Sequence, residues 1–209
     1  MHFDCSGRLT KMLNYAHQVL SVADHSTTLP AYDFNTKMNT YKTHIQHLDE
    51  HKAALICPKN SDCFLLCVAT DKSVYAQPAN EPSTKYTVQS QWNMLNCILP
   101  PDTVVKAIVY VDNTNTLQMG LFDILRCAGV NQTHKDVLSR HSLLHTTYHN
   151  SNPDLTCPVK VHWVGFESVC LKYLSENNDH LPFPANSVLR VEDDLCMKVL
   201  TQLPAWSWF

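Results

Sequence analysis

Apolar positions recur with a helical period in the first part of the chain. The residues that share this spacing are Leu9, Met12, Leu13, Ala16 and Leu20. Side chains three or four residues apart lie on one face of an α-helix, so we expect an amphipathic helix over residues 8–24. A second helix is expected over residues 38–52. Together these make residues 1–50 an N-terminal helical segment.

From Ala53 onward the apolar runs become short and turn residues separate them. The runs 53–57 and 64–69 are joined by Pro58-Lys59-Asn60-Ser61-Asp62, an arrangement typical of a β-hairpin. A loop is expected over residues 76–85. Further strands are expected at 74–75, 94–99, 104–111, 118–125, 159–164, 187–191 and 195–200, and helices at 135–148 and 168–175. Many strands with few helices predict an α+β domain over residues 51–209, with antiparallel sheets and flanking helices.

Composition narrows the classes of function. The net charge of −3 gives no broad basic surface, so any contact with RNA is expected to be local and DNA is not an expected partner. No apolar run is long enough for a membrane span, and no secretory signal is visible. Nine cysteines without a Cys-x-x-Cys pair favour reduced thiols in the cytoplasm, the nucleus or both. Four widely separated glycines exclude a P-loop and a dinucleotide-binding fingerprint.

The segment 121–144 carries the most specific pattern in the chain. Phe122-Asp123-Ile124-Leu125 is followed by a turn with Gly129 and then by a predicted helix that contains Arg140 and Leu143-Leu144. This order resembles the nucleotidyltransferase superfamily of mRNA capping guanylyltransferases and polynucleotide ligases. Residues 94–99 stand where that superfamily has a Leu-Asp-Gly-Glu strand, and residues 186–200 stand where it has its last two motifs. The resemblance implies a nucleotidyltransferase-like (adenylation or guanylylation) fold, with a nucleotide-sized cleft between the Lys59 hairpin and the C-terminal strands.

Three departures from the superfamily pattern argue against catalysis. Nucleotidyl transfer there needs a desolvated lysine in a Lys-x-Asp-Gly loop, but this loop reads Lys59-Asn60-Ser61-Asp62 and has no glycine. Carboxylates that would hold a metal ion are also missing from segments 95–98 and 185–187. We therefore expect no catalytic residue, no metal and no cofactor. A divergent guanylyltransferase or ligase with Lys59 as its nucleophile is the alternative.

Snurportin-type cap-binding domains are a branch of the superfamily with similar losses. This chain resembles them over residues 56–58, 63–66, 75 and 94–98. The resemblance implies binding of a nucleotide or a methylated RNA 5′ cap, with a tryptophan stacked on the base. The implied site residues are Trp206, Trp208, Lys59, Lys72, Lys85, Tyr75 and Lys198. The expected partner is therefore a nucleotide or capped RNA. A third alternative is a scaffold that keeps the fold and binds only protein.

Histidines and cysteines at regular spacing have simpler explanations. His141, His145 and His149 lie four residues apart, on one face of a predicted helix. Such pairs can bind zinc, but no neighbouring glutamate completes a ligand set, so we expect a solvated face. The cysteines of the predicted hairpin are expected to be small buried hydrophobic residues.

Overall fold

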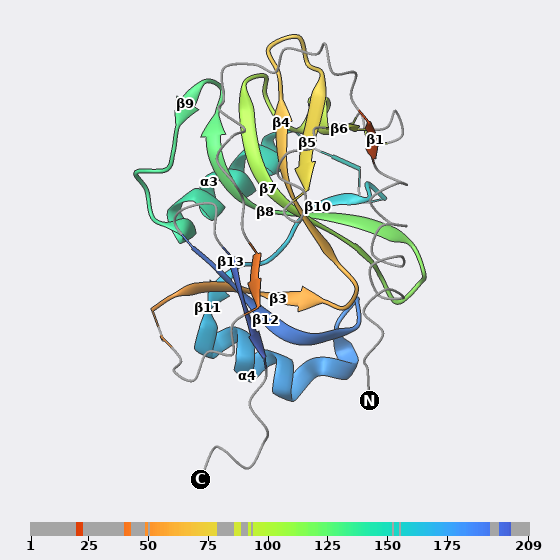
Figure 1. Ribbon diagram of the computed structural model, residues 1–209, viewed down its shortest axis with the longest axis vertical. Helices are drawn as coiled ribbons and strands as arrows, with labels where there is room; N and C mark the ends of the chain where they lie inside the picture. The colour runs from red at the N-terminus through yellow and green to blue at the C-terminus, as the bar shows by residue number, and fades with distance from the viewer. Residues whose placement is uncertain are drawn as a thin grey trace.

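Two β-sheets cross in the computed structural model of this chain, and helices cover their outer faces (Figure 1). The larger sheet occupies the upper part of Figure 1, and the smaller sheet lies below it with helix α4 (Glu167–Asn177). The structure describes residues 20–22, 40–42, 49, 51–78, 86–88, 92, 94–151, 153–154, 156–192 and 197–201.

The larger sheet has the strand order β1-β6-β5-β4-β7-β8-β10, with β9 paired to β8. Its strands are β1 (Leu20–Val22), β4 (Asp62–Val68), β5 (Val74–Pro78), β6 (Tyr86–Val88), β7 (Thr103–Val111), β8 (Leu117–Cys127), β9 (Val130–Asn131) and β10 (Val159–Val161). All pairings are antiparallel except that of β10, which runs parallel to β8. β7 is buried on both faces because its residues alternate between two apolar cores, one on each face of the sheet.

The smaller sheet has the order β11-β3-β12-β13-β2. Its strands are β2 (Thr40–Lys42), β3 (Ala53–Pro58), β11 (Gly165–Phe166), β12 (Ala185–Val191) and β13 (Met197–Thr201). β12 pairs antiparallel with both β3 and β13, whereas β2 pairs parallel with β13.

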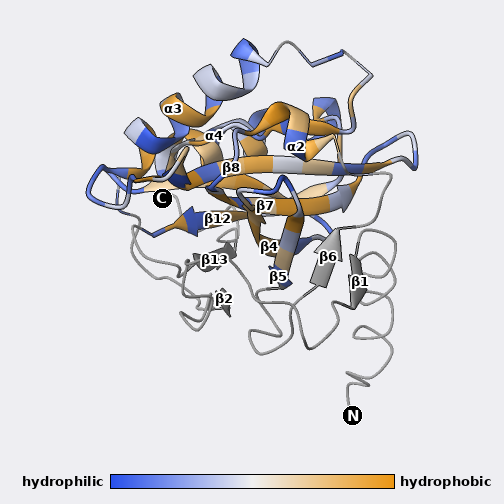
Figure 2. Cartoon of the chain, turned by 90° about the horizontal axis from the view of Figure 1, so that it is seen from above, coloured by the Kyte–Doolittle hydropathy of each residue, from blue (hydrophilic) through white to orange (hydrophobic). Residues whose placement is uncertain are grey.

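Two apolar cores hold the layers together. One lies between the larger sheet and helix α3 (Val137–Asn150), and Leu121 and Leu144 both belong to it. The other is shared by both sheets and α4, and it includes Phe122, Val188 and Leu174. Figure 2 shows the hydrophobic residues concentrated on the central strands and the hydrophilic residues in the connecting loops. Burial of these residues is the main force that keeps the two sheets together.

The predicted α+β fold is confirmed. Strands are present at most of the expected places after residue 51, and α3 and α4 match the two helices predicted in that part of the chain. The strand expected over residues 159–164 is shorter, because β10 ends at Val161 and the chain then passes to β11 in the other sheet.

The predicted hairpin around Lys59 is wrong. β3 pairs with β11 and β12 in the smaller sheet, whereas β4 pairs with β5 and β7 in the larger sheet. The turn between them therefore connects two sheets. Asn60 at its tip has a positive φ of 55°, which asparagine tolerates well, and the Lys59 amide donates to the Pro184 carbonyl at 2.7 Å.

The strand predicted over residues 94–99 is also wrong, because Leu95–Ile98 form the short helix α2. Leu95 and Ile98 are both buried, and this spacing of three residues suits a helix better than a strand. The loop expected over residues 76–85 begins later, since β5 continues to Pro78.

The N-terminal segment contributes strands where helices were expected. Leu20–Val22 pair with β6 in the larger sheet, and Thr40–Lys42 pair with β13 in the smaller one. The rest of the two predicted helices lies largely outside the described residues. The boundary at residue 51 stays a prediction.

Candidate functional site

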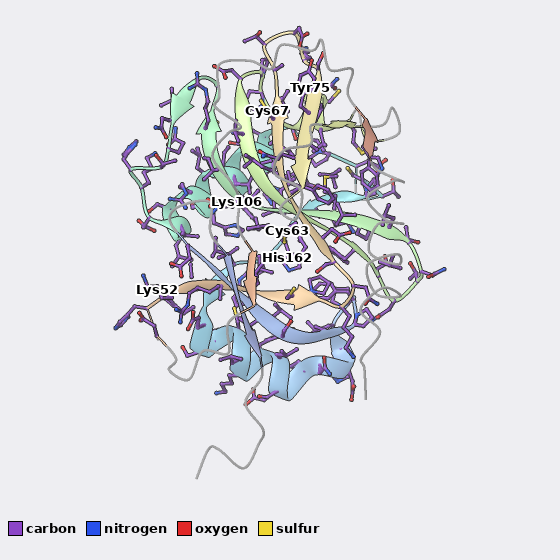
Figure 3. The ribbon with its side chains drawn as sticks, viewed as in Figure 1. Lys52, Cys63, Cys67, Tyr75, Lys106 and His162 are labelled. Carbon is purple, nitrogen blue, oxygen red and sulfur yellow. The ribbon has the colours of Figure 1, made fainter. Side chains whose placement is uncertain are left out.

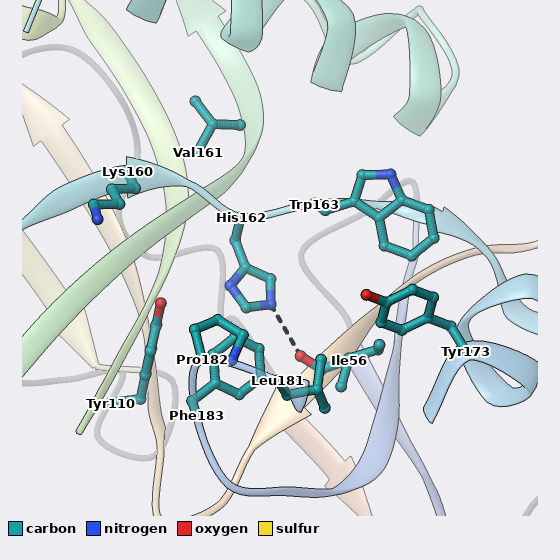
Figure 4. A pocket seen from close by; sticks show the side chains of 10 residues that line it. All are labelled: Ile56, Tyr110, Lys160, Val161, His162, Trp163, Tyr173, Leu181, Pro182 and Phe183. Carbon is teal, nitrogen blue, oxygen red and sulfur yellow. Dashed lines mark hydrogen bonds between the residues drawn. The ribbon is translucent and has the colours of Figure 1, made fainter. Parts of the chain in front are cut away.

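A pocket opens where the chain crosses from the larger sheet to the smaller one. Its volume is about 470 Å³, within the size range of small-molecule sites. It is lined by Ile56, Tyr110, Lys160, Val161, His162, Trp163, Tyr173, Leu181, Pro182 and Phe183 (Figure 4). The lining is mostly apolar and aromatic, with only a few polar groups, as is usual for small-molecule sites.

Three aromatic side chains form the buried part of this pocket. Tyr110 meets Phe183 edge to face with ring centroids 5.0 Å apart, and it meets His162 at 5.9 Å. His162 stacks on Phe183 at 5.3 Å. All three side chains are buried. Because each ring supports the other two, this part of the wall is preformed.

Two glycines make room for the pocket residues. A Cβ at Gly120 in β8 would lie 2.8 Å from the Cβ of His162, so only glycine lets β10 lead into His162 at this distance. A Cβ at Gly165 would lie 2.5 Å from Cη2 of Trp163. The Trp163 indole therefore lies directly over Gly165.

Trp163 and Tyr173 form the exposed side of the pocket. Trp163 is 50% exposed and Tyr173 is 45% exposed, unusually high values for aromatic residues in a folded chain. Helix α4, which carries Tyr173, is fixed at its first residue because the buried Glu167 carboxylate accepts hydrogen bonds from Arg190 of β12. Lys160 supplies a positive charge at the opposite side of His162 (Figure 4).

His162 is held neutral within the pocket wall. Its backbone amide donates to the Leu121 carbonyl at 2.7 Å, and Nε2 lies 2.9 Å from the Ile56 carbonyl oxygen. Burial lowers the pKa of His162 to about 4, against a weaker opposite effect of the Ile56 hydrogen bond. Burial also raises the pKa of Tyr110 to about 12, so its hydroxyl keeps its proton.

A second group of polar side chains links the strand and the helix of segment 121–144. Asp123 of β8 accepts two hydrogen bonds from Arg140 of α3, at 2.8 and 3.0 Å, and an ion pair from Lys106 of β7 at 3.0 Å. All three side chains are fully buried. Both carboxylate oxygens of Asp123 are thus engaged by cations.

Sequence reasoning missed Lys106. Its position was visible, since it is the one charged residue within the apolar run Thr103–Val111. A buried lysine needs a partner of opposite charge, but only the strand register, which places Lys106 opposite Asp123, identifies that partner.

The turn that carries Lys59 offers one exposed lysine and one buried acid. Lys59 is solvent-exposed. Asp62 is only 8% exposed, and its Oδ2 has no hydrogen-bond partner within the described part of the chain. Burial raises the pKa of Asp62 to about 6. Burial also raises the pKa of the neighbouring Cys63 thiol well above its usual value, so this thiol is not an activated nucleophile.

Among the predicted site residues with described side chains, Lys59, Lys72 and Tyr75 do not line the pocket. Lys72 is exposed after the end of β4, whereas Lys59 precedes the beginning of that strand. Seven residues of strand separate them by roughly 20 Å. Tyr75 is buried in β5, in the upper part of Figure 3, away from His162. Lys198 lies opposite Arg190 in β13. Trp206, Trp208 and Lys85 lie outside the described residues.

The histidines of α3 are divided between two environments. His141 is half-buried and its Nδ1 lies 3.1 Å from the Phe122 carbonyl oxygen, so this histidine does not belong to the expected solvated face. His145 and His149 are exposed, with their Nε2 atoms 3.2 Å apart. No group of three or more metal-binding side chains occurs among the residues that the structure describes. No helix in the same residues is long and apolar enough to cross a membrane.

Comparisons with known proteins identify solved structures that share the fold of this chain. No known protein family matches the sequence, and no curated protein matches it. Mycobacterial DNA ligase D complexed with ATP and MES has a similar structure, with a TM-score of 0.56 and 12% identity, over 83% of this chain and 62% of that one. The ligase domain of LigD from M. tuberculosis has a TM-score of 0.53 and 13% identity, over 83% of this chain and 58% of that one.

These similarities establish the fold. The chain has the nucleotidyltransferase fold of polynucleotide ligase domains. It spans less than two thirds of the length of either ligase chain. The finer resemblance to snurportin-type domains gains no support from these comparisons.

Proposed function

We propose that this nucleotidyltransferase-fold chain binds a nucleotide or an RNA 5′ cap without transferring it. The observation that carries the proposal is the aromatic pocket at the crossing of the sheets, where Tyr110, His162 and Phe183 form a buried wall beside the exposed Trp163. Stacking of one base on an aromatic side chain contributes about 1–3 kcal/mol. Lys160 at the pocket wall suits a phosphate group.

Two features support the absence of transfer. Lys59 is exposed on its turn, whereas a nucleophilic lysine must be desolvated to lose its proton near neutral pH. In addition, segments 95–98 and 185–187 have no carboxylate, and the carboxylate of Asp123 is engaged by Lys106 and Arg140. Metal-assisted phosphoryl chemistry needs free oxygen ligands.

A methylated cap is the finer form of this proposal. A methylated, positively charged base gains cation–π attraction of about 0.5–2 kcal/mol from an aromatic partner. Trp206 and Trp208 are the partners that the sequence proposes, and Trp163 is the partner that the pocket geometry adds. Under this proposal the chain acts in the cytoplasm, the nucleus or both.

Fluorescence titration tests the proposal. Trimethylguanosine and 7-methylguanosine cap analogues, GTP and ATP would be titrated while tryptophan emission is recorded. We expect saturable quenching by at least one ligand, with the methylated caps tightest if the finer form holds. Trp163→Ala should weaken binding, whereas Val130→Ala, which removes an exposed apolar side chain of β9, should not.

Two outcomes would contradict this proposal. If none of the four ligands binds at millimolar concentration, the pocket is not a nucleotide site. If quenching survives in Trp163→Ala but is lost in the Trp206→Ala/Trp208→Ala double variant, the ligand stacks at the chain end instead.

A divergent nucleotidyltransferase is the second candidate. Its support is the fold shared with a ligase whose structure holds ATP, together with the position of Lys59 on the turn that joins the two sheets. Incubation with labelled ATP or GTP and magnesium would give a covalent adduct if this candidate is right. The adduct should disappear in Lys59→Ala and persist in Lys72→Ala, since Lys72 is an exposed lysine near the other end of β4.

A further inference from the structure

His162 is fixed in one orientation within the pocket wall. Its backbone is tied to Leu121, its ring stacks on Phe183, and Gly120 allows β8 to approach it closely. Nε2 lies 2.9 Å from the Ile56 carbonyl oxygen. The imidazole therefore has little freedom to rotate or to exchange the positions of its two nitrogens.

The hydrogen bond to Ile56 determines which nitrogen carries the proton. A carbonyl oxygen can only accept, so Nε2 must donate and must carry the hydrogen. The neutral ring then presents a lone pair at Nδ1, and burial keeps the ring neutral, as its lowered pKa indicates.

Nδ1 lies close to β8, because a Cβ at Gly120 would be 3.0 Å from it. None of the hydrogen bonds found among the described residues involves this atom. Figure 4 shows that this nitrogen lies on the side of the ring that faces Tyr110 and Lys160, away from the bond to Ile56. A ligand N–H group that reaches this nitrogen would satisfy its lone pair.

We propose that His162 selects the ligand, by accepting at Nδ1 a hydrogen bond from an N–H group on the edge of a purine base. The inference rests on the proposed function, because it assumes that the base enters this pocket. Tyr110, whose hydroxyl keeps its proton, adds a donor on the same side of His162, and Lys160 adds a cation for the phosphate. The ligand class is a purine nucleotide with an unblocked N–H edge.

Matched pairs of ligands test this role. Wild-type protein would be titrated calorimetrically with AMP and GMP, and with the analogue of each in which every base N–H is replaced by N-methyl. We expect the parent of at least one pair to bind about tenfold more tightly than its analogue, since the analogue leaves Nδ1 without a donor.

The variant His162→Gln separates hydrogen bonding from steric exclusion. Glutamine can still donate to the Ile56 carbonyl but offers no acceptor at the place of Nδ1. We expect the preference for the parent nucleotide to disappear in this variant while the N-methylated analogue binds as in the wild type. His180→Gln changes an exposed histidine and should leave the preference intact.

A spectroscopic measurement on the wild type guards against misfolding of the variant. The nitrogen-15 resonance of a bare imidazole nitrogen moves upfield when it accepts a hydrogen bond, so we expect this shift for Nδ1 of His162 on addition of nucleotide. If nucleotides bind but no such shift occurs, or the preference persists in His162→Gln, the role of His162 is overturned while the pocket proposal stands. If AMP and GMP do not bind, the role of His162 is overturned, and if the cap analogues, GTP and ATP also fail to bind, the pocket proposal is overturned with it.

Discussion

Asp123 is the residue on which the buried polar cluster depends. It forms ion pairs with both Lys106 and Arg140, and all three side chains are fully buried. Asp123→Asn would leave two cations in the core with a neutral partner. We expect the free energy of unfolding to fall by about 3–5 kcal/mol, the usual cost of a buried charge that loses its partner. Urea denaturation followed by circular dichroism at pH 7 measures this change.

The ion pair between Asp102 and Arg126 provides the matched control. It has a similar two-bond geometry, but both side chains are 29% exposed. Asp102→Asn should therefore cost about 1 kcal/mol or less. Equal losses in the two variants would contradict the structural role given to Asp123.

His162 should make the stability of the fold depend on pH. Its pKa is lowered from 6.5 in the unfolded chain to about 4 in the folded chain. The unfolded chain therefore binds a proton more readily between these values, and stability falls as the pH decreases from 6.5 to 4, by up to about 3 kcal/mol. His162→Gln should lack this loss.

The measurement must compare the two proteins, because Asp62 acts in the opposite direction. The pKa of Asp62 is raised from 3.8 to about 6, so its contribution to stability is lost as the pH rises through this range. The difference in free energy of unfolding between the wild type and His162→Gln cancels the effect of Asp62. Parallel curves between pH 4 and 7 would show that His162 does not titrate as stated.

Among the elements, the connection between β10 and β11 controls the exposed side of the pocket. In Gly165→Ala the new Cβ would lie 2.5 Å from the Trp163 ring, so the indole must move. The ring is half exposed and can move cheaply, so we expect a change in stability below about 1 kcal/mol. Nucleotide affinity should fall about tenfold, as in Trp163→Ala, because a stacking surface is lost. Unchanged affinity in both variants would remove Trp163 from the binding wall.

The strands and helices could be predicted from sequence where local patterns determine them. α3 and α4 have their apolar residues at helical spacing, and β7 and β8 are long apolar runs. Pairing between distant strands could not be predicted in this way. The runs before and after Lys59 look like the two arms of a hairpin, but each finds better partners in a different sheet.

The pocket was invisible for the same reason. Tyr110, His162 and Phe183 are far apart in the chain and share no spacing that marks a site. Only the parallel pairing of β10 with β8, which begins at Val159 and Met119, brings His162 beside Tyr110. By contrast, the strand that carries Asp123 and the helix that carries Arg140 were both predicted, because strand, turn and helix are consecutive in the chain.

The molecule as a whole should unfold in one step. Both sheets contribute to one core, in which Phe122 of β8 lies in the same cluster as Val188 of β12. Loss of either sheet would expose the inner face of the other, so neither is stable alone. We expect tryptophan fluorescence and far-ultraviolet circular dichroism to give the same midpoint in urea. Two separate midpoints would mean that the sheets are independent units.

The pocket also has a mechanical consequence, because its walls come from both halves of the molecule. Ile56 belongs to the smaller sheet and Tyr110 to the larger one. A ligand bound there would contact both sheets, so it would have to dissociate when the sheets separate on unfolding. When its free concentration is a hundred times its Kd, such a ligand adds about 2.7 kcal/mol to the free energy of unfolding. A thermal-shift screen of metabolites would therefore reveal the natural ligand by the increase in Tm that it causes.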